Sequence, residues 1–264
     1  MPPTFIAFGP GKSSVITYKN HWQTVASEGS SILALKQKVK DENGIVQSFA
    51  FGEGGSWFIS YDLPNGTSRW RWEGIDVHYP NLKKWLDDFK TRSWTAKGLA
   101  ASLGLGGSYW AWEKSRGFSW ANLSKNLVNR LTEDTDKRYT QNVTLGLDGS
   151  YVYRSDRGGS LISIKGYEGA AEWLNPRVKS GGGKLKIATV SLSAFDGGVY
   201  FFLLSDGTAY WRAPPHLTAK AELVRDKYIG NLPKLVVGGA KKEGGAKKEG
   251  GPKKGKGGIL KKKK

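Results

Sequence analysis

One hydrophobic pattern recurs along the chain: an apolar residue, a glycine-rich turn, a small residue, and then a run of aromatic and β-branched residues. The five copies occupy residues 8–18, 51–61, 103–112, 145–153 and 195–202. Anchored at Ser14, Ser56, Ser108, Ser150 and Gly198, they lie 42, 52, 42 and 48 residues apart. Recurrence at a nearly constant spacing indicates a structure built from internal repeats.

Each copy predicts a small antiparallel meander of three strands. A first strand, such as Ile45–Phe51 or Ile187–Leu192, leads into the glycine turn, where glycine's access to positive φ allows a tight reversal. The aromatic run is the second strand. A turn such as Asn65-Gly66 follows, and a third strand such as Ser68–Trp72 often carries tryptophan; further third strands are expected at Phe118–Trp120 and Ala209–Trp211.

Polar connectors with leucines at helical spacing follow the third strands. Leu82–Leu86 and Leu123–Leu131 are the clearest of them, and single helical turns are expected there. Short strands repeated about every 40–50 residues predict an all-β, five-repeat β-propeller-like domain, which we assign to residues 1–238.

Neighbouring units must stack, because one small unit cannot bury both of its faces. Lys234–Val237 is expected to return as a strand beside Thr4–Phe8 and to close the ring, which would remove exposed sheet edges. An open stack or a β-sandwich is the structural alternative.

The repeat unit, seen most clearly at Gly54-Gly-Ser-Trp-Phe58, continues with a glycine, a tryptophan and two leucines. It resembles the repeats of propeller-like fungal proteins and is loosely similar to the tectonin-type repeats of lectin-like propellers. The likeness covers about residues 4–235. The Gly-His…Trp-Asp pattern of WD40 repeats is absent. The resemblance implies a binding scaffold and carries over no site residue.

The composition narrows the function classes. The chain has no cysteine, which excludes disulfides, thiolate nucleophiles and cysteine zinc sites. No apolar run approaches the roughly 20 residues that a spanning helix needs, and the N-terminus lacks the features of a signal peptide. The sequence therefore predicts a cytoplasmic or nuclear protein without a membrane span.

The C-terminal tail, residues 239–264, has a different composition from the rest. Residues 240–264 contain eleven lysines and two glutamates, a net charge of +9 out of +18 for the chain. Such a segment has almost nothing to bury and is predicted to be disordered. Its lysines are candidates for binding polyanions such as nucleic acid: Lys241, Lys242, Lys247, Lys248, Lys253, Lys254, Lys256, Lys261, Lys262, Lys263 and Lys264. A solubilising tail or a nuclear address is the alternative.

Residue patterns that would carry catalysis or bind a metal or cofactor are missing. His21, His78 and His216 stand at no metal-ligand spacing, and Gly9–Ser13 lacks the first glycine of a phosphate-binding loop. We therefore expect no catalytic residue, no metal and no cofactor, and no enzymatic activity.

Two groups of acids keep one enzymatic alternative open. Asp87-Asp88 and Glu133-Asp-Thr-Asp136 lie in polar connectors, where solvated charge is the usual explanation. Paired carboxylates support glycosidase chemistry only at defined separations across a cleft. A glycosidase-type enzyme is thus a weakly supported alternative.

Aromatic residues fall at matching places in the repeats and are the candidate ligand-binding groups. They are Trp57, Trp72, Tyr109, Trp120, Tyr151 and Trp211. Large aromatics commonly pack between blades, so a core role is the simpler interpretation; an outward-facing set would stack on sugars or bases. The sequence therefore predicts a monomeric, non-enzymatic binding module, with a protein partner or a glycan on the propeller face. Of these two, a scaffold for protein partners is favoured slightly over a lectin-like carbohydrate-binding propeller.

Overall fold

The computed structural model describes residues 4–18, 21–26, 30–91, 98–113, 117–133, 140–155, 160–180 and 185–230. The chain divides into two units, Met1–Leu232 and Pro233–Lys264. All described residues belong to the first unit. The candidate lysines of the tail and the expected closing strand Lys234–Val237 lie outside the described residues.

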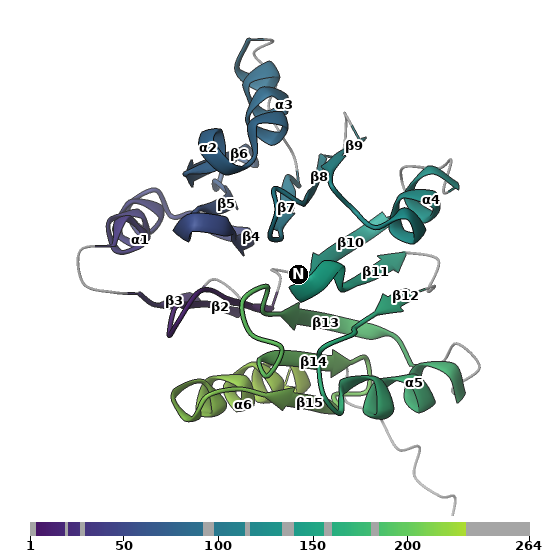
Figure 1. The fold of residues 1–264 in the computed structure, drawn as a ribbon. Helices are drawn as coiled ribbons and strands as arrows, with labels where there is room; N and C mark the ends of the chain where they lie inside the picture. The colour runs from purple at the N-terminus through teal and green to yellow at the C-terminus, as the bar shows by residue number, and fades with distance from the viewer. Residues whose placement is uncertain are drawn as a thin grey trace, which may run out of the picture. The chain divides into compact units, whose positions relative to one another are not determined.

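The first unit consists mainly of five three-stranded antiparallel sheets, each formed by consecutive strands in chain order (Figure 1). The strands are β1 Phe5–Phe8, β2 Ser14–Tyr18, β3 His21–Val25, β4 Ile45–Phe51, β5 Trp57–Asp62, β6 Ser68–Glu73, β7 Ala100–Leu103, β8 Tyr109–Glu113, β9 Gly117–Ala121, β10 Thr140–Leu145, β11 Tyr151–Ser155, β12 Ser160–Ser163, β13 Ile187–Leu192, β14 Tyr200–Leu204 and β15 Ala209–Arg212. Every sheet is open. The prediction of five strand meanders is confirmed.

Helices follow the sheets along the chain. They are α1 Ser31–Asp41, α2 Ile75–His78, α3 Pro80–Thr91, α4 Lys125–Glu133, α5 Ala170–Ser180 and α6 Pro215–Ile229. Short 3₁₀ turns occupy Glu53–Gly55 and Leu147–Gly149. The expectation of single helical turns in the connectors was wrong, because α3 has 12 residues and α4 has 9.

Local sequence signals set where several of these helices begin. The Ser30 side chain accepts a hydrogen bond from the Ile32 amide, 3.3 Å away, at the start of α1, as expected of an N-cap serine. The Ser124 hydroxyl accepts one from the Leu127 amide at 3.4 Å. α6 starts at Pro215, whose fixed φ suits a first helical position.

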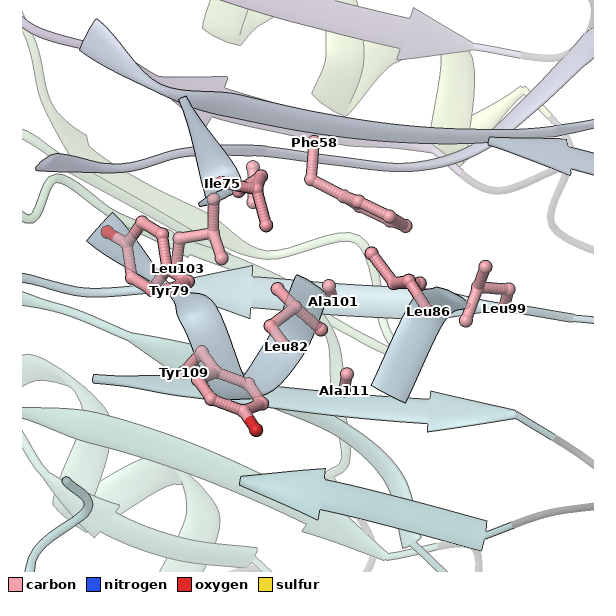
Figure 2. Packing of buried hydrophobic residues seen from close by; sticks show 11 residues of the cluster. Phe58, Ile75, Tyr79, Leu82, Leu86, Leu99, Ala101, Leu103, Tyr109 and Ala111 are labelled. Atoms are coloured by element: carbon pink, nitrogen blue, oxygen red, sulfur yellow. The ribbon is translucent and has the colours of Figure 1, made fainter. Parts of the chain in front are cut away.

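Each hydrophobic cluster joins one sheet to the next through a helix. Figure 2 shows the cluster between the second and third sheets, where Leu82 and Leu86 of α3 lie among Phe58 of β5 and Leu103 of β7. Leucines four residues apart share one face of a helix, so this face is buried on both sheets. The helices are longer than predicted because they fill the space between successive sheets.

The same packing joins the last sheet to the first. Leu217 and Val224 of α6 are buried in one cluster with Phe201 of β14 and Ile16 of β2. α6 contacts β1, β2 and β15. The fifth inter-sheet cluster therefore connects elements from opposite ends of the described chain.

The first strands of the sheets contact one another in a cycle: β1 with β4, β4 with β7, β7 with β10, β10 with β13, and β13 with β1. Side-chain hydroxyls connect several of these pairs. Ser48 of β4 donates to the Ala101 carbonyl at 3.2 Å, and Ser102 of β7 accepts from the Leu145 amide at 2.9 Å. Ser191 of β13 donates to the carbonyl of Ile6 in β1.

Strand register corrects two of the five anchors of the sequence repeat. In each sheet, one residue at the start of the second strand pairs with the last residue of the first strand. In the second to fifth sheets this residue is Trp57, Tyr109, Tyr151 or Tyr200, and in the first sheet it is Ser14, opposite Phe8. The first and last anchors are therefore Ser13 and Val199, and the spacings become 43, 52, 42 and 49 residues. The last turn has two more residues than the others, which explains the shift of the last anchor.

Candidate functional site

Three of the six candidate aromatic residues are buried. Trp57, Tyr109 and Tyr151 are only 6%, 2% and 3% exposed. Their polar atoms bind within the protein: the Trp57 Nε1 donates to the Glu73 carboxylate at 3.0 Å, and the Tyr109 hydroxyl lies 2.8 Å from the Ser119 hydroxyl. In this structure the three rings pack in the core between sheets.

The other three candidates, Trp72, Trp120 and Trp211, take one repeat position on the third strands. They face Phe58, Trp110 and Phe201 across the strand pair and are half-buried against the hydrophobic clusters.

Cations cover two of these half-buried rings. The Lys83 ammonium lies 5.4 Å from the Trp72 ring centroid, and the Arg225 guanidinium lies 5.5 Å from that of Trp211. Ligand stacking on the exposed parts of the three rings stays a prediction.

The acidic and histidine candidates do not come together. Asp87 forms an ion pair with Lys83 on the same helix, Glu133 is exposed at the end of α4, and Asp134 and Asp136 lie outside the described residues. In the described part of the chain, no group of three histidine or acidic residues could hold a metal ion. Among the same residues, no helix is long and apolar enough to cross a membrane.

Two buried tyrosines connect neighbouring sheets in the same way. The Tyr79 hydroxyl accepts from the Glu53 amide at 2.8 Å and donates to the Gly104 carbonyl at 2.6 Å. The Tyr167 hydroxyl accepts from the Leu147 amide at 2.7 Å and donates to the Ser193 carbonyl. Burial raises the pKa of both tyrosines. Both hydroxyls are used in structural bonds.

A cavity of about 380 Å³ is lined by all five first strands. One end is apolar and is lined by the buried last residues of these strands: Phe8, Phe51, Leu103, Leu145 and Leu192. The other end, where the strands begin, is lined by Thr4, Gln47, Trp112, Asn142 and Arg154. We call these five residues the polar end.

The polar end combines hydrogen-bonding groups, an aromatic ring and a cation. Arg154 is 9% exposed, and its Nη1 donates to the carbonyls of Ile187 at 3.2 Å and Ala188 at 2.5 Å. Asn142 is directly opposite Arg154 in the β10–β11 pair, so both side chains lie on one face of the sheet. This arrangement can hold a small polar molecule, and no residue of it was predicted from the sequence.

Irregular pairing recurs in the first strands where they enter this polar end. The register shifts between Val46 and Ser48, between Thr140 and Asn142, and between Ile187 and Thr189. Such bulges redirect side chains and are frequent beside functional sites. One sequence signal could have pointed to Arg154. It occupies a position of the repeat at which three of the other copies have a small or apolar residue.

Comparison with known proteins gives no further guide: no protein-family model, curated protein or solved structure matches this chain.

Proposed function

We propose that the described unit is a five-bladed β-propeller that acts as a non-enzymatic binding module. The observation that carries the proposal is the cavity lined by all five first strands. The cyclic contacts of those strands and the bond from Ser191 to Ile6 support the ring. Concave sites of this size, with a few placed polar groups, are typical small-ligand sites.

The tail adds a second, electrostatic function to this proposal. Its eleven lysines make sequence-independent contact with a polyanion such as nucleic acid. Residues 240–264 contain no arginine and no aromatic residue; they therefore lack the bidentate arginine fork that commonly reads guanine. The charge density of this segment far exceeds that of the rest of the chain, since half of the net charge lies in it.

Fluorescence anisotropy with labelled duplex DNA tests the tail. If about six to eight lysines neutralise phosphates, affinity should fall about 10³-fold or more between about 50 and 200 mM salt. A chain truncated after Gly239 should lose most of that affinity and most of the salt dependence. The matched control keeps the tail at full length with its eleven lysines replaced by glutamine, which separates charge from length.

Two results would overturn the role of the tail. Equal affinity and salt slope in the full and truncated chains would move the binding element to the rest of the molecule. Absence of binding by the full chain at low salt would leave the tail as a solubility or address segment.

A lectin-like propeller is the second candidate. Three equivalent half-buried rings, Trp72, Trp120 and Trp211, support it. Several weak equivalent sites would give avidity, so glycan-array binding with more than one site per chain would favour this candidate. Recovery of one specific protein with a negative array would favour a protein scaffold.

A further inference from the structure

The chain contains the dipeptide Asn-Gly twice, at Asn43-Gly44 and at Asn65-Gly66. An asparagine before glycine is prone to deamidation, because glycine has no side chain to hinder attack of its amide nitrogen on the asparagine Cγ. The reaction needs the glycine amide to leave its hydrogen bond and approach that carbon. The surroundings of each glycine therefore decide which of the two asparagines reacts in the folded chain.

Asn65-Gly66 lies in the exposed turn between β5 and β6. Both residues are exposed, and a side chain at Gly66 would have no neighbour within 4 Å. The Gly66 amide donates to the Leu63 carbonyl at 2.9 Å. The Asn65 Oδ1 accepts from the amide and the hydroxyl of Thr67, at 3.0 and 2.8 Å. These bonds lie within one short turn, so a local movement of exposed residues releases the Gly66 amide.

Asn43-Gly44, at the end of α1, has a packed environment. The Gly44 amide donates to the Val39 carbonyl at 2.8 Å. A side chain at Gly44 would lie 2.6 Å from the Tyr61 ring, so this fully buried ring packs directly on the glycine. Release of the Gly44 amide therefore requires displacement of core residues, which costs more free energy than the opening of an exposed turn.

The fifth sheet contains the same turn with aspartate in place of asparagine. In Leu204–Thr208, as in Leu63–Thr67, the glycine amide donates to the leucine carbonyl. The Asp206 carboxylate accepts from the amide and the hydroxyl of Thr208, both at 2.9 Å. The aspartate form of residue 65 should therefore keep the turn intact.

We propose that Asn65 is a site of spontaneous deamidation and that the fold protects Asn43 from the same reaction. The Gly66 nitrogen bonds to the Asn65 Cγ, and its proton passes through water to Nδ2, which leaves as ammonia. Water then opens the resulting succinimide at either carbonyl and gives aspartate or isoaspartate. During the attack, the amide and hydroxyl of Thr67 stabilise the negative charge that develops on Oδ1.

The two products differ in their effect on the hairpin. Aspartate adds a negative charge and leaves the main chain unchanged. Isoaspartate inserts the Cβ of residue 65 into the main chain, and the geometry and length of a turn fix the register of its hairpin. The isoaspartate form should therefore melt at a lower temperature than the Asn65→Asp variant, which should melt like the unchanged chain.

Peptide mapping of the full chain after incubation in mildly alkaline buffer tests the proposal, with fragment spectra that separate residue 65 from residue 43. In the folded chain, Asn65 should convert at least about tenfold faster than Asn43, because the openings that release the two glycine amides differ in free energy. In urea the difference should disappear, since unfolding removes the packing of Tyr61 on Gly44.

Asn65→Gln is the matched variant. It keeps an amide at this exposed position, but its longer side chain would have to close a larger ring with Gly66, which is a much slower reaction. The variant should fold like the unchanged chain and should show no conversion at residue 65 over the same time.

Three outcomes would overturn the proposal. They are no conversion of Asn65 in the folded chain during the time in which the unfolded chain converts, a rate ratio between Asn65 and Asn43 below about tenfold in the folded chain, and equal conversion in Asn65→Gln. None of these measurements involves a ligand, so their outcome is independent of the proposed binding function.

Discussion

Replacing Tyr167 by phenylalanine should destabilise the protein strongly without changing its core volume. The substitution removes the hydroxyl that accepts from the Leu147 amide and donates to the Ser193 carbonyl. Tyr167 is almost fully buried, as is Ser193. Leaving a buried donor or acceptor without a partner costs about 1–3 kcal/mol; for these two groups together we expect a loss of roughly 2–4 kcal/mol.

The Tyr79→Phe variant should behave in the same way, because its hydroxyl bonds the Glu53 amide and the Gly104 carbonyl between the second and third sheets. The two tyrosines connect different pairs of sheets. Their effects should therefore add to within about 0.5 kcal/mol in the double variant.

Equilibrium unfolding in urea measures these losses, and the slope against urea should stay unchanged if only stability differs. A melting-point decrease of roughly 5–15 °C should accompany a loss of this size. Tyr109→Phe is the control, since its hydroxyl pairs with another side-chain hydroxyl, that of Ser119, and its loss should cost about 1 kcal/mol. The reasoning is refuted if Tyr167→Phe costs no more than this control.

Two further predictions concern charge. Burial raises the pKa of Tyr79, Tyr109 and Tyr167, so these tyrosines ionise at lower pH in the unfolded chain than in the folded one. The free energy of unfolding should therefore keep its full value below about pH 10 and fall above it, by up to about 1.4 kcal/mol per pH unit for each tyrosine. Urea titrations from pH 9 to 11 that show no decline would contradict this. Burial and the charge of Lys36 lower the pKa of Lys220, so Lys36→Glu should raise the free energy of unfolding by up to about 1 kcal/mol at low salt. Lys12→Glu makes the same change in net charge on an exposed turn and should not raise it.

The number and type of the sheets could be predicted from the sequence because strand signals are local. Ile45–Phe51 and Ile187–Leu192 were predicted as first strands with the bounds that the structure has. Asn65-Gly66 was predicted as a turn, and Gly66 has the positive φ, 80°, that explains the glycine. The alternation of apolar runs with glycine turns involves residues that are close together in the chain. It can therefore be recognised from the sequence alone.

Helix length and the candidate site depended on the tertiary structure. Leu82 and Leu86 show one apolar stripe in sequence, but only the space between two sheets decides how far α3 continues. Trp57 and Tyr109 occupy matching positions in the repeats, but matching positions do not reveal whether the side chains are exposed. The neighbouring sheet covers both residues and buries them.

Arg154 is the clearest example of the difference. In sequence it follows Tyr153 at the end of an aromatic run, and it was not singled out from the sequence. The strand register brings it beside Asn142, and the next sheet brings the carbonyls of Ile187 and Ala188 against its guanidinium. The local pattern of the chain determined the five meanders. Contacts between meanders more than 30 residues apart decided which side chains surround the cavity, because inter-sheet packing has no local signal.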